Sequence, residues 1–204
     1  MTGFVGIKKE SRKQTQDISA IDSGFYDCVY ESSPEYKVDP SLTHWYPLWR
    51  IATRGIPKDA RVLDLGCGPG QVACMLKDDG ITSYVGADWS EEAISMARVK
   101  CPEFQFEIID LRHLTDVKDL MKRTNPSIIL LFETLEHIED DLGLLECLLC
   151  GISIRATLPS GEAYSHARWF TSEEKISERY GDLLEIESIE RVAPSWWAMQ
   201  AKRA

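Results

Sequence analysis

The stretch 62–70, which reads VLDLGCGPG, constrains the fold more than any other part of the chain. It begins as an apolar run typical of a buried strand and ends in alternating glycines. Glycine adopts positive φ and lets another molecule touch bare backbone, while Pro69 fixes one φ without needing an N–H. We therefore predict a strand joined to a helix by a tight turn. Asp64 lies near the carboxyl end of this strand, where open α/β sheets bind ligands.

The acid that precedes the glycines separates this turn from a dinucleotide site. The dinucleotide pattern G-x-G-x-x-G presents a helix N-terminus to a pyrophosphate, whereas D-x-G-x-G-x-G carries a carboxylate that repels phosphate and favours an amine or another cation. This pattern resembles the signature of class I S-adenosylmethionine (SAM)-dependent methyltransferases. By that resemblance, the methionine end of the cofactor is held by Asp64, Gly66, Cys67, Gly68 and Gly70. A tight turn without a ligand is the alternative interpretation.

Downstream of residue 58, short apolar runs alternate with helical patterns, as in parallel sheets with crossover helices. We expect strands at 61–65, 83–87, 104–109, 127–132 and 153–158, then a hairpin of 183–191 and 195–202. We expect helices at 71–77, 116–124 and 141–150. Two more helices should begin at N-terminal caps, one at Ser90 and one at a capping box of Thr171 and Glu174. The resemblance implies a Rossmann-like class I methyltransferase fold: α/β, with a seven-stranded, mostly parallel sheet and an antiparallel last strand.

Two further strands end in an acid. Asp88 follows Asp64 at about the 20-residue offset at which a carboxylate meets a ribose diol, and its alternative role is that of an ordinary helix cap. Trp89 either stacks on adenine or covers the sheet. By the resemblance, Asp110 and Leu111 bind the adenine. Three acids at successive strand ends together carry the cofactor prediction.

The fourth predicted strand delivers the sequence ETLEH, residues 133–137. This segment resembles the E-x-x-E-H stretch of ubiquinone-biosynthesis O-methyltransferases, and HARWFT, residues 166–171, resembles their later H-x-R-x-F-T stretch. The resemblance places Glu133, His137 and His166 at the methyl group as catalytic candidates, with Glu133 also touching the cofactor and Arg168 facing the acceptor.

The same residues raise the question of a metal. If the chain turns helically after the strand, Glu133 shares a face with Glu136 and His137, and the later loop brings in His166. Their donors suit Mn²⁺, Fe²⁺ or Zn²⁺ better than Mg²⁺, although the resembled enzymes are associated with Mg²⁺. A bound cation would lower the pKa of a hydroxyl acceptor. In the plainer interpretation, Glu136 and His137 start a helix and His166 only hydrogen-bonds the acceptor.

We divide the chain into a flexible tail (1–20), a cap or lid (21–58) and a SAM-binding domain (59–204). The cap is rich in aromatic residues and prolines, which either pack on the domain or line a pocket. We expect most rings to pack and the acceptor site to be formed by residues from the set Tyr26, Tyr30, Tyr36 and Trp45. This segment would close over the cleft when ligand binds.

Composition excludes several classes of function. A formal net charge of −10 disfavours binding to nucleic acid through phosphates. No run of about 18 apolar residues could span a membrane, and the first residues lack the apolar core of a secretory signal, so we expect a cytoplasmic protein. The six cysteines show no disulfide framework. In the Cys147–Cys150 pair, packing is a better interpretation than metal or redox chemistry.

The expected function is methyl transfer from SAM to a small-molecule acceptor, favouring oxygen because of the local resemblance. Small-RNA 3′-terminal 2′-O-methyltransferases also carry E-x-x-E-H and a later histidine, so an RNA-modifying relative is one alternative. A non-catalytic SAM-binding protein is another. The sequence specifies neither the acceptor nor the oligomeric state.

Overall fold

The computed structural model describes residues 22–148, 152–160, 170–194 and 196–204. Its centre is one seven-stranded sheet in the order β3-β2-β1-β4-β5-β7-β6. The strands are β1 (Arg61–Leu65), β2 (Ser83–Asp88), β3 (Gln105–Ile108), β4 (Ile128–Leu131), β5 (Ser153–Pro159), β6 (Leu184–Ala193) and β7 (Trp196–Arg203). The first five run parallel, and β7 is antiparallel to both of its neighbours, β5 and β6. The predicted fold class is confirmed.

The strand order reverses between β1 and β4, which are neighbours in the sheet but not in the sequence. At such a switch point the loops after the two strands leave in opposite directions and open a crevice at the carboxyl edge. The glycine turn follows β1, and the segment 132–137 follows β4. Both predicted motifs therefore reach one crevice.

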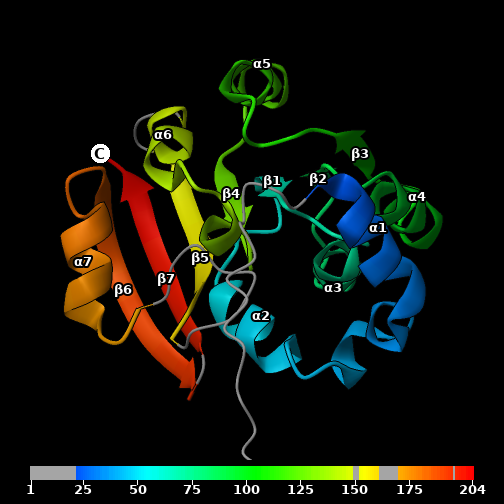
Figure 1. Cartoon of the computed structure of the whole chain (residues 1–204), viewed down its shortest axis with the longest axis horizontal. Coiled ribbons are helices and arrows are strands. Elements are labelled where there is room, and N and C mark those ends of the chain that lie inside the picture. Colours follow the sequence, from blue (N-terminus) through cyan, green and yellow to red (C-terminus); the bar gives the residue numbers. More distant parts are fainter. Residues whose placement is uncertain (1–21, 149–151, 161–169, 195) are drawn as a thin grey trace, which may run out of the picture.

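Helices cover both faces of the sheet. They are α1 (Ser23–Ser32), α2 (Tyr46–Ala52), α3 (Gln71–Asp78), α4 (Glu91–Lys100), α5 (Leu114–Thr124), α6 (Asp141–Glu146) and α7 (Glu173–Tyr180). Short 3₁₀ turns lie at η2 (Pro34–Tyr36), η3 (Pro40–Leu42) and η4 (Leu135–His137). Figure 1 shows α1, α3 and α4 beside the β1–β3 end of the sheet and α7 beside β6 at the opposite end.

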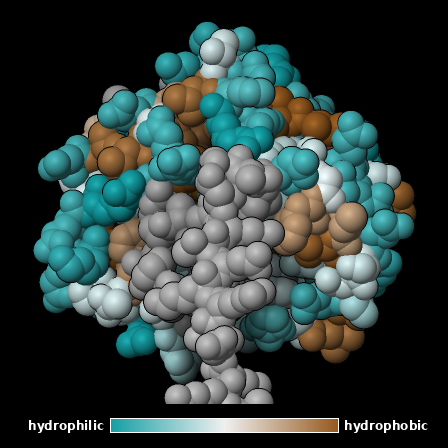
Figure 2. Space-filling model, in the orientation of Figure 1, coloured by the Kyte–Doolittle hydropathy of each residue, from teal (hydrophilic) through white to brown (hydrophobic). Residues whose placement is uncertain are grey.

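Two hydrophobic cores result from the alternation of side chains along the strands. Leu63 and Leu65 of β1 pack with α5, α6 and α7, whereas Val62 packs on the other face with α2, α3 and α4. Trp197 and the partly buried Trp196 join opposite cores, as the hairpin prediction required. The surface in Figure 2 carries hydrophilic side chains around most of its outline, with hydrophobic residues in separate patches.

Several predicted boundaries were wrong, because tertiary packing overrode local signals. Helix α5 begins at Leu114 rather than Asp116, since Leu114 packs on the core. Helix α6 ends at Glu146, where the N–H of Cys147 is shared between two carbonyls and the last turn tightens. The N-cap of α7 is Ser172, which has extended backbone, so the predicted capping box at Thr171 does not form.

The structure bears on the expectations about membrane spans and about the Cys147–Cys150 pair only where residues are described. Within the described ranges, no helix combines the length and apolar character needed to cross a membrane. Cys147 is buried and carries a free thiol, as expected for packing, while Cys150 lies outside the described residues. The predicted tail lies outside them too.

Candidate functional site

The glycine turn has the left-handed backbone that its sequence predicted. Gly66, Gly68 and Gly70 have φ values of 84°, 51° and 79°. A Cβ at Gly66 would stand 2.3 Å from Thr134 Oγ1, and a Cβ at Gly70 would stand 2.9 Å from the Cβ of Ala97. A side chain at either position would therefore collide with its neighbour, whatever ligand the turn binds.

The amides of this turn are engaged by the end of β2. The N–H groups of Gly66 and Cys67 both donate to the carbonyl of Ala87, at 2.8 and 3.0 Å. The N–H of Gly68 donates to Asp88 Oδ2 at 2.9 Å, and the N–H of Ser90 donates to Asp88 Oδ1 at 3.0 Å. The N–H groups of Gly66, Cys67 and Gly68 are thus already used within the protein and are not available to a phosphate.

Asp64 is buried beneath the turn and is only half satisfied. Tyr84 Oη donates to Asp64 Oδ2 at 2.5 Å, while Oδ1 is buried without a hydrogen-bond partner among the described residues. Burial raises the pKa of this carboxyl to about 7, against the opposing hydrogen bond from Tyr84. An unpartnered buried carboxylate oxygen is costly alone and suits a cationic amine.

A first cavity of about 180 Å³ opens beside Asp88 and the end of β3. It is lined by Tyr26, Tyr30, Gly66, Asp88, Trp89, Ile109, Asp110, Leu111, Arg112, Glu133, Thr134, His137, Ile138 and Glu139. Its apolar walls with acids at two strand ends fit a nucleoside. The predicted ribose and adenine residues Asp88, Trp89, Asp110 and Leu111 all reach it.

Arg112, which the sequence analysis missed, changes how two of these residues act. It forms a bidentate pair with Asp110, Nε to Oδ1 at 2.9 Å and Nη2 to Oδ2 at 2.7 Å, and its guanidinium lies 4.4 Å from the Trp89 ring centre. The ion pair contributes to lowering the pKa of Asp110. Arg112 therefore fixes the acid and the ring in one arrangement at the cavity wall.

A second cavity of about 120 Å³ lies against the glycine turn. Its walls are Tyr26, Tyr30, Tyr36, Trp49, Asp64, Gly66, Cys67, Gly68, Pro69, Gln71, Val72, Phe132, Glu133 and His137. Tyr26, Tyr30, Gly66, Glu133 and His137 line both cavities. The two cavities are therefore neighbours around Gly66, and Asp64 lies in the wall of the second.

Glu133 sits at the boundary of the two cavities in a strained conformation. Its φ is 53°, a left-handed value that costs a non-glycine residue of order 1–3 kcal/mol. Its N–H donates to Thr157 Oγ1 at 2.8 Å, and Trp49 Nε1 donates to its Oε1 at 3.2 Å. Burial raises the pKa of the carboxyl to about 8. Strain and burial together indicate a functional constraint here.

The metal prediction gains no support from the described residues. After β4 the chain makes a short 3₁₀ turn, η4, and Glu136 is fully buried within it. Glu133, Glu136 and His137 do not gather into a group able to hold a metal ion in the described ranges. His166 and Arg168 lie outside those ranges.

Aromatic residues of the cap form a continuous row of rings. Tyr26, Tyr30, Tyr36, Trp45 and Trp49 contact one another in sequence, with centroids 4.8–6.2 Å apart. Trp45 stacks between Tyr36 and Trp49 and is not among the described lining residues of either cavity, so its predicted place at the acceptor site stays a prediction. Trp49, not predicted as a site residue, takes the place at the cavity wall.

Tyr26 links the row to the segment after β4. Its hydroxyl lies 3.3 Å from His137 Nδ1, and its ring centre lies 5.6 Å from that of Trp89. Burial raises the pKa of Tyr26 to about 12, so the hydroxyl keeps its proton at neutral pH and can donate it to the imidazole. The tautomer of His137 decides whether it does.

Comparisons with known proteins show the family of the chain. Residues 45–149 match the family model described as "Methyltransferase domain", which covers more than half of the chain. The chain belongs to this family and is a class I SAM-dependent methyltransferase by fold and sequence.

Individual relatives are similar over limited stretches. The chain is 42% identical over 62 residues to the trans-aconitate 2-methyltransferase of Variovorax paradoxus (strain S110), covering 30% of this chain and 24% of that protein. It is 35% identical over 88 residues to the ubiquinone biosynthesis O-methyltransferase of Dinoroseobacter shibae (strain DSM 16493 / NCIMB 14021 / DFL 12). This match covers 43% of this chain and 35% of that protein. The matches span about a quarter to a third of these curated relatives.

Solved structures share the fold at low sequence identity. The magnesium protoporphyrin IX methyltransferase of Synechocystis PCC 6803 with bound SAM has a TM-score of 0.62 and 17% identity, covering 91% of this chain and 99% of that one. The complex between the Haloferax volcanii Trm112 methyltransferase activator and "the putative methyltransferase" has a TM-score of 0.69 and 17% identity. The match covers 87% of this chain and 97% of that one. At these identities the likeness shows the fold alone.

Asp64 gives a prediction about pH. Because its pKa is about 7 and a bound ammonium needs the ionised form, affinity for S-adenosylhomocysteine should fall about tenfold for each pH unit below 7. Asp64→Asn keeps the size of the side chain but removes its charge, so affinity at pH 7.5 should fall roughly 10- to 100-fold. Calorimetry from pH 5 to 8 measures both effects. An unchanged pH slope in the variant would assign the titration to another group.

Glu133 gives a prediction about stability. Glu133→Gly relieves the left-handed strain and removes a buried carboxyl, so it should raise the free energy of unfolding by about 1–2 kcal/mol at pH 7. The pKa of about 8 in the folded protein exceeds the ordinary glutamate pKa of 4.5, so ionisation weakens the parent protein as pH rises from 4.5 to 8. The gain should therefore grow over that range in urea titrations.

The matched control is Asn125→Gly, because Asn125 is the other non-glycine residue with positive φ in the described ranges. It lies at the end of α5, away from both cavities. We expect it to stabilise the protein without affecting function, whereas Glu133→Gly should lose function. A Glu133→Gly protein less stable than its parent would show that the strain is not relieved.

Proposed function

We propose that this protein transfers a methyl group from SAM to a hydroxyl oxygen of a small, non-anionic molecule. The observation that carries the proposal is a pair of neighbouring cavities that share five lining residues, one bordered by acids at two strand ends and one lined by a half-satisfied buried acid. The three predicted acids lie along this space. When bound, SAM supplies a methyl group activated by a positively charged sulfonium.

In this proposal each cavity binds a different part of the cofactor. Asp64 Oδ1 accepts from the amine of the methionine end. Asp88 accepts from the ribose hydroxyls with lone pairs that its two backbone donors leave, and Trp89, Asp110 and Leu111 border the adenine. Gly66 borders both cavities and has no room for a side chain, because a Cβ there would collide with Thr134.

Glu133 is the residue that we propose to receive the acceptor's proton. It lines both cavities, and its pKa of about 8 makes its carboxylate a stronger base than an ordinary glutamate. Trp49 and Thr157 hold it in place through the side chain and the backbone respectively. His137 is the second candidate, and His166 stays a prediction. The divalent cation also stays a prediction, since one of its four proposed ligands lies outside the described residues.

The walls of the second cavity bear on the charge of the acceptor. Its described lining residues include two carboxyls, Asp64 and Glu133, and five tyrosine, tryptophan and phenylalanine rings, but neither lysine nor arginine. The acids and rings around Glu133, where the acceptor hydroxyl must arrive, favour a neutral aromatic or cationic acceptor over one with several negative charges. This supports a phenol-like acceptor over a polycarboxylate such as the substrate in the name of the Variovorax relative. Oxygen rather than nitrogen rests on the Dinoroseobacter relative.

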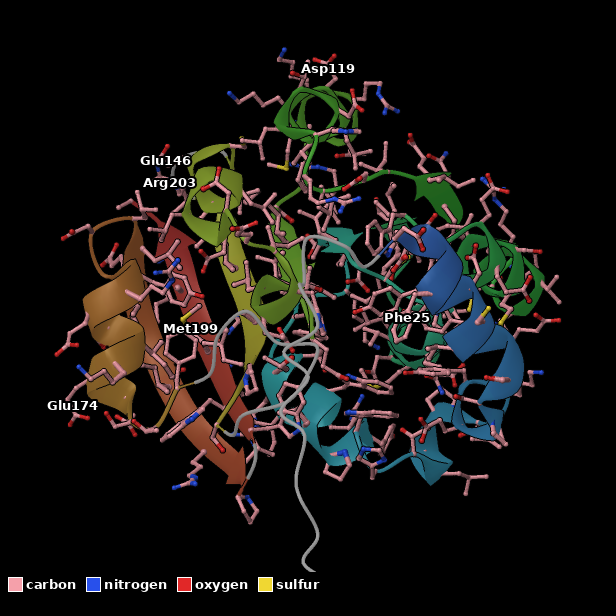
Figure 3. The ribbon with its side chains drawn as sticks, viewed as in Figure 1. Phe25, Asp119, Glu146, Glu174, Met199 and Arg203 are labelled. Carbon is pink, nitrogen blue, oxygen red and sulfur yellow. The ribbon has the colours of Figure 1, made fainter. Side chains whose placement is uncertain are left out.

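An acceptor panel tests the proposal. Phenols and catechols should give S-adenosylhomocysteine and methyl ethers, aromatic amines should react more slowly, and trans-aconitate should not react. Glu133→Gln should lower kcat/KM roughly 10²-fold or more. Its control is Glu146→Gln, on the surface of α6 away from the cavities (Figure 3). Cofactor binding without turnover on any of these acceptors would favour a non-catalytic SAM-binding protein.

In the cap, we propose that α1 acts as a lid and that α2 is a fixed part of the core. Helix α2 buries Leu48, Trp49 and Ala52 and packs against β5, β6 and β7. Helix α1 buries no residue, and Phe25 on it is 45% exposed (Figure 3). It is held instead by polar contacts, among them the 2.5 Å bond from Ser90 Oγ to Asp27.

Hydrogen exchange separates the two halves. S-adenosylhomocysteine should slow amide exchange in α1, because a filled cavity gives Tyr26 and Tyr30 a surface to pack on, and should leave exchange in α2 unchanged. Asp27→Asn should speed exchange in α1 of the free protein. Equal protection of α1 with and without ligand would make the whole cap a static part of the domain.

A further inference from the structure

The start of helix α3 lies directly against helix α4. At Gly70 the space for a side chain is taken by Ala97, whose Cβ would lie 2.9 Å away from an added Cβ. One helical turn further along each segment come Cys74, whose N–H donates to the Gly70 carbonyl, and Cys101, whose N–H donates to the Ala97 carbonyl. The backbone contact at Gly70 therefore brings the two cysteines together.

The two sulfur atoms are in contact. Cys74 Sγ lies 2.7 Å from Cys101 Sγ, across 27 positions of sequence, and both thiols are free. Cys74 is half-buried, so a small reagent can reach it, whereas Cys101 is completely buried. One thiol is thus accessible and the other lies behind it as a partner.

The surroundings activate the accessible thiol. A hydrogen bond from Cys101, together with the ammonium groups of Lys100 and Lys77, lowers the pKa of Cys74 to about 7, against the effects of burial and Asp78. The same contact raises the pKa of Cys101. These contacts favour the thiolate form of Cys74, which is the form that attacks oxidants.

We propose that Cys74 and Cys101 form a dithiol site that a hydroperoxide oxidises to a disulfide between α3 and α4. The Cys74 thiolate attacks one peroxide oxygen, the O–O bond breaks, and the leaving oxygen takes a proton to become water or an alcohol. Cys74 then carries a sulfenic acid. The Cys101 sulfur attacks it, the S–S bond forms, the S–O bond breaks, and water leaves with the Cys101 proton. Two thiols are oxidised and one peroxide is reduced.

The cross-link would act on the cofactor side of the sheet. The closed segment 74–101 contains β2, Asp88 and Trp89, and its first cysteine lies one turn after the glycine turn. A disulfide there restricts the unfolded chain and holds α3 and α4 together without altering a residue that lines either cavity. We expect oxidation to raise the midpoint of thermal unfolding and to preserve cofactor affinity.

The test treats the full-length protein with a small excess of hydrogen peroxide, blocks remaining thiols, and maps peptides by mass spectrometry without reduction. The expected product is a linked Cys74–Cys101 peptide pair, lighter than the two thiol peptides by two hydrogens. Cys101→Ser should instead leave Cys74 as a sulfenic acid that a 1,3-diketone probe captures. Cys74→Ser should leave Cys101 reduced, and circular dichroism checks that each variant is folded.

Cys28→Ser is the matched control, because Cys28 is the exposed cysteine on α1 and should not affect the linkage. Recovery of both Cys74 and Cys101 as blocked thiols after oxidation would overturn the proposal. So would oxidation confined to Cys28, seen as dimers between chains. The experiment needs neither SAM nor an acceptor, so its result is independent of the proposed function.

Discussion

The carboxylate of Asp88 joins the two loops on which the cavities depend. It accepts from Gly68 in the turn after β1 and from Ser90 at the start of α4, while Ala87 beside it accepts from Gly66 and Cys67. The turn is thereby fixed against β2, and its amides are withdrawn from any phosphate. What the turn offers to a ligand is its exposed glycine backbone and the acid beneath it.

The positions of the strands along the chain and the place of the crevice could be predicted from the sequence, because they depend on local patterns. A few neighbouring residues are enough to recognise each of these patterns: the apolar runs, the D-x-G-x-G-x-G turn, and the acids Asp64, Asp88 and Asp110 at strand ends. Parallel strands then bring their carboxyl ends to one edge. No long-range information is needed for that step.

The contacts that tune these residues were not predictable, because they join distant parts of the chain. Trp49 and Glu133 are 84 positions apart, and Tyr84 and Asp64 are 20 apart on neighbouring strands. The positive φ of Glu133 has no signal in its own residue type. Arg112 stands two residues from Asp110 and could have been considered, since Asp and Arg at that spacing can pair across a turn.

The position of β7 in the sheet has a consequence for how the chain folds during synthesis. β7 is made after β6 but lies between β5 and β6, so β6 has no place in the sheet until β7 has been made. Helix α2, which carries Trp49, packs on these same strands. In a nascent chain β1 to β5 can form before β6 and β7 have been made. Helix α2, whose Trp49 contacts Glu133, can pack fully only when the β6–β7 hairpin has joined the sheet. Quality control that senses exposed strand edges would therefore act on this protein until late in its synthesis.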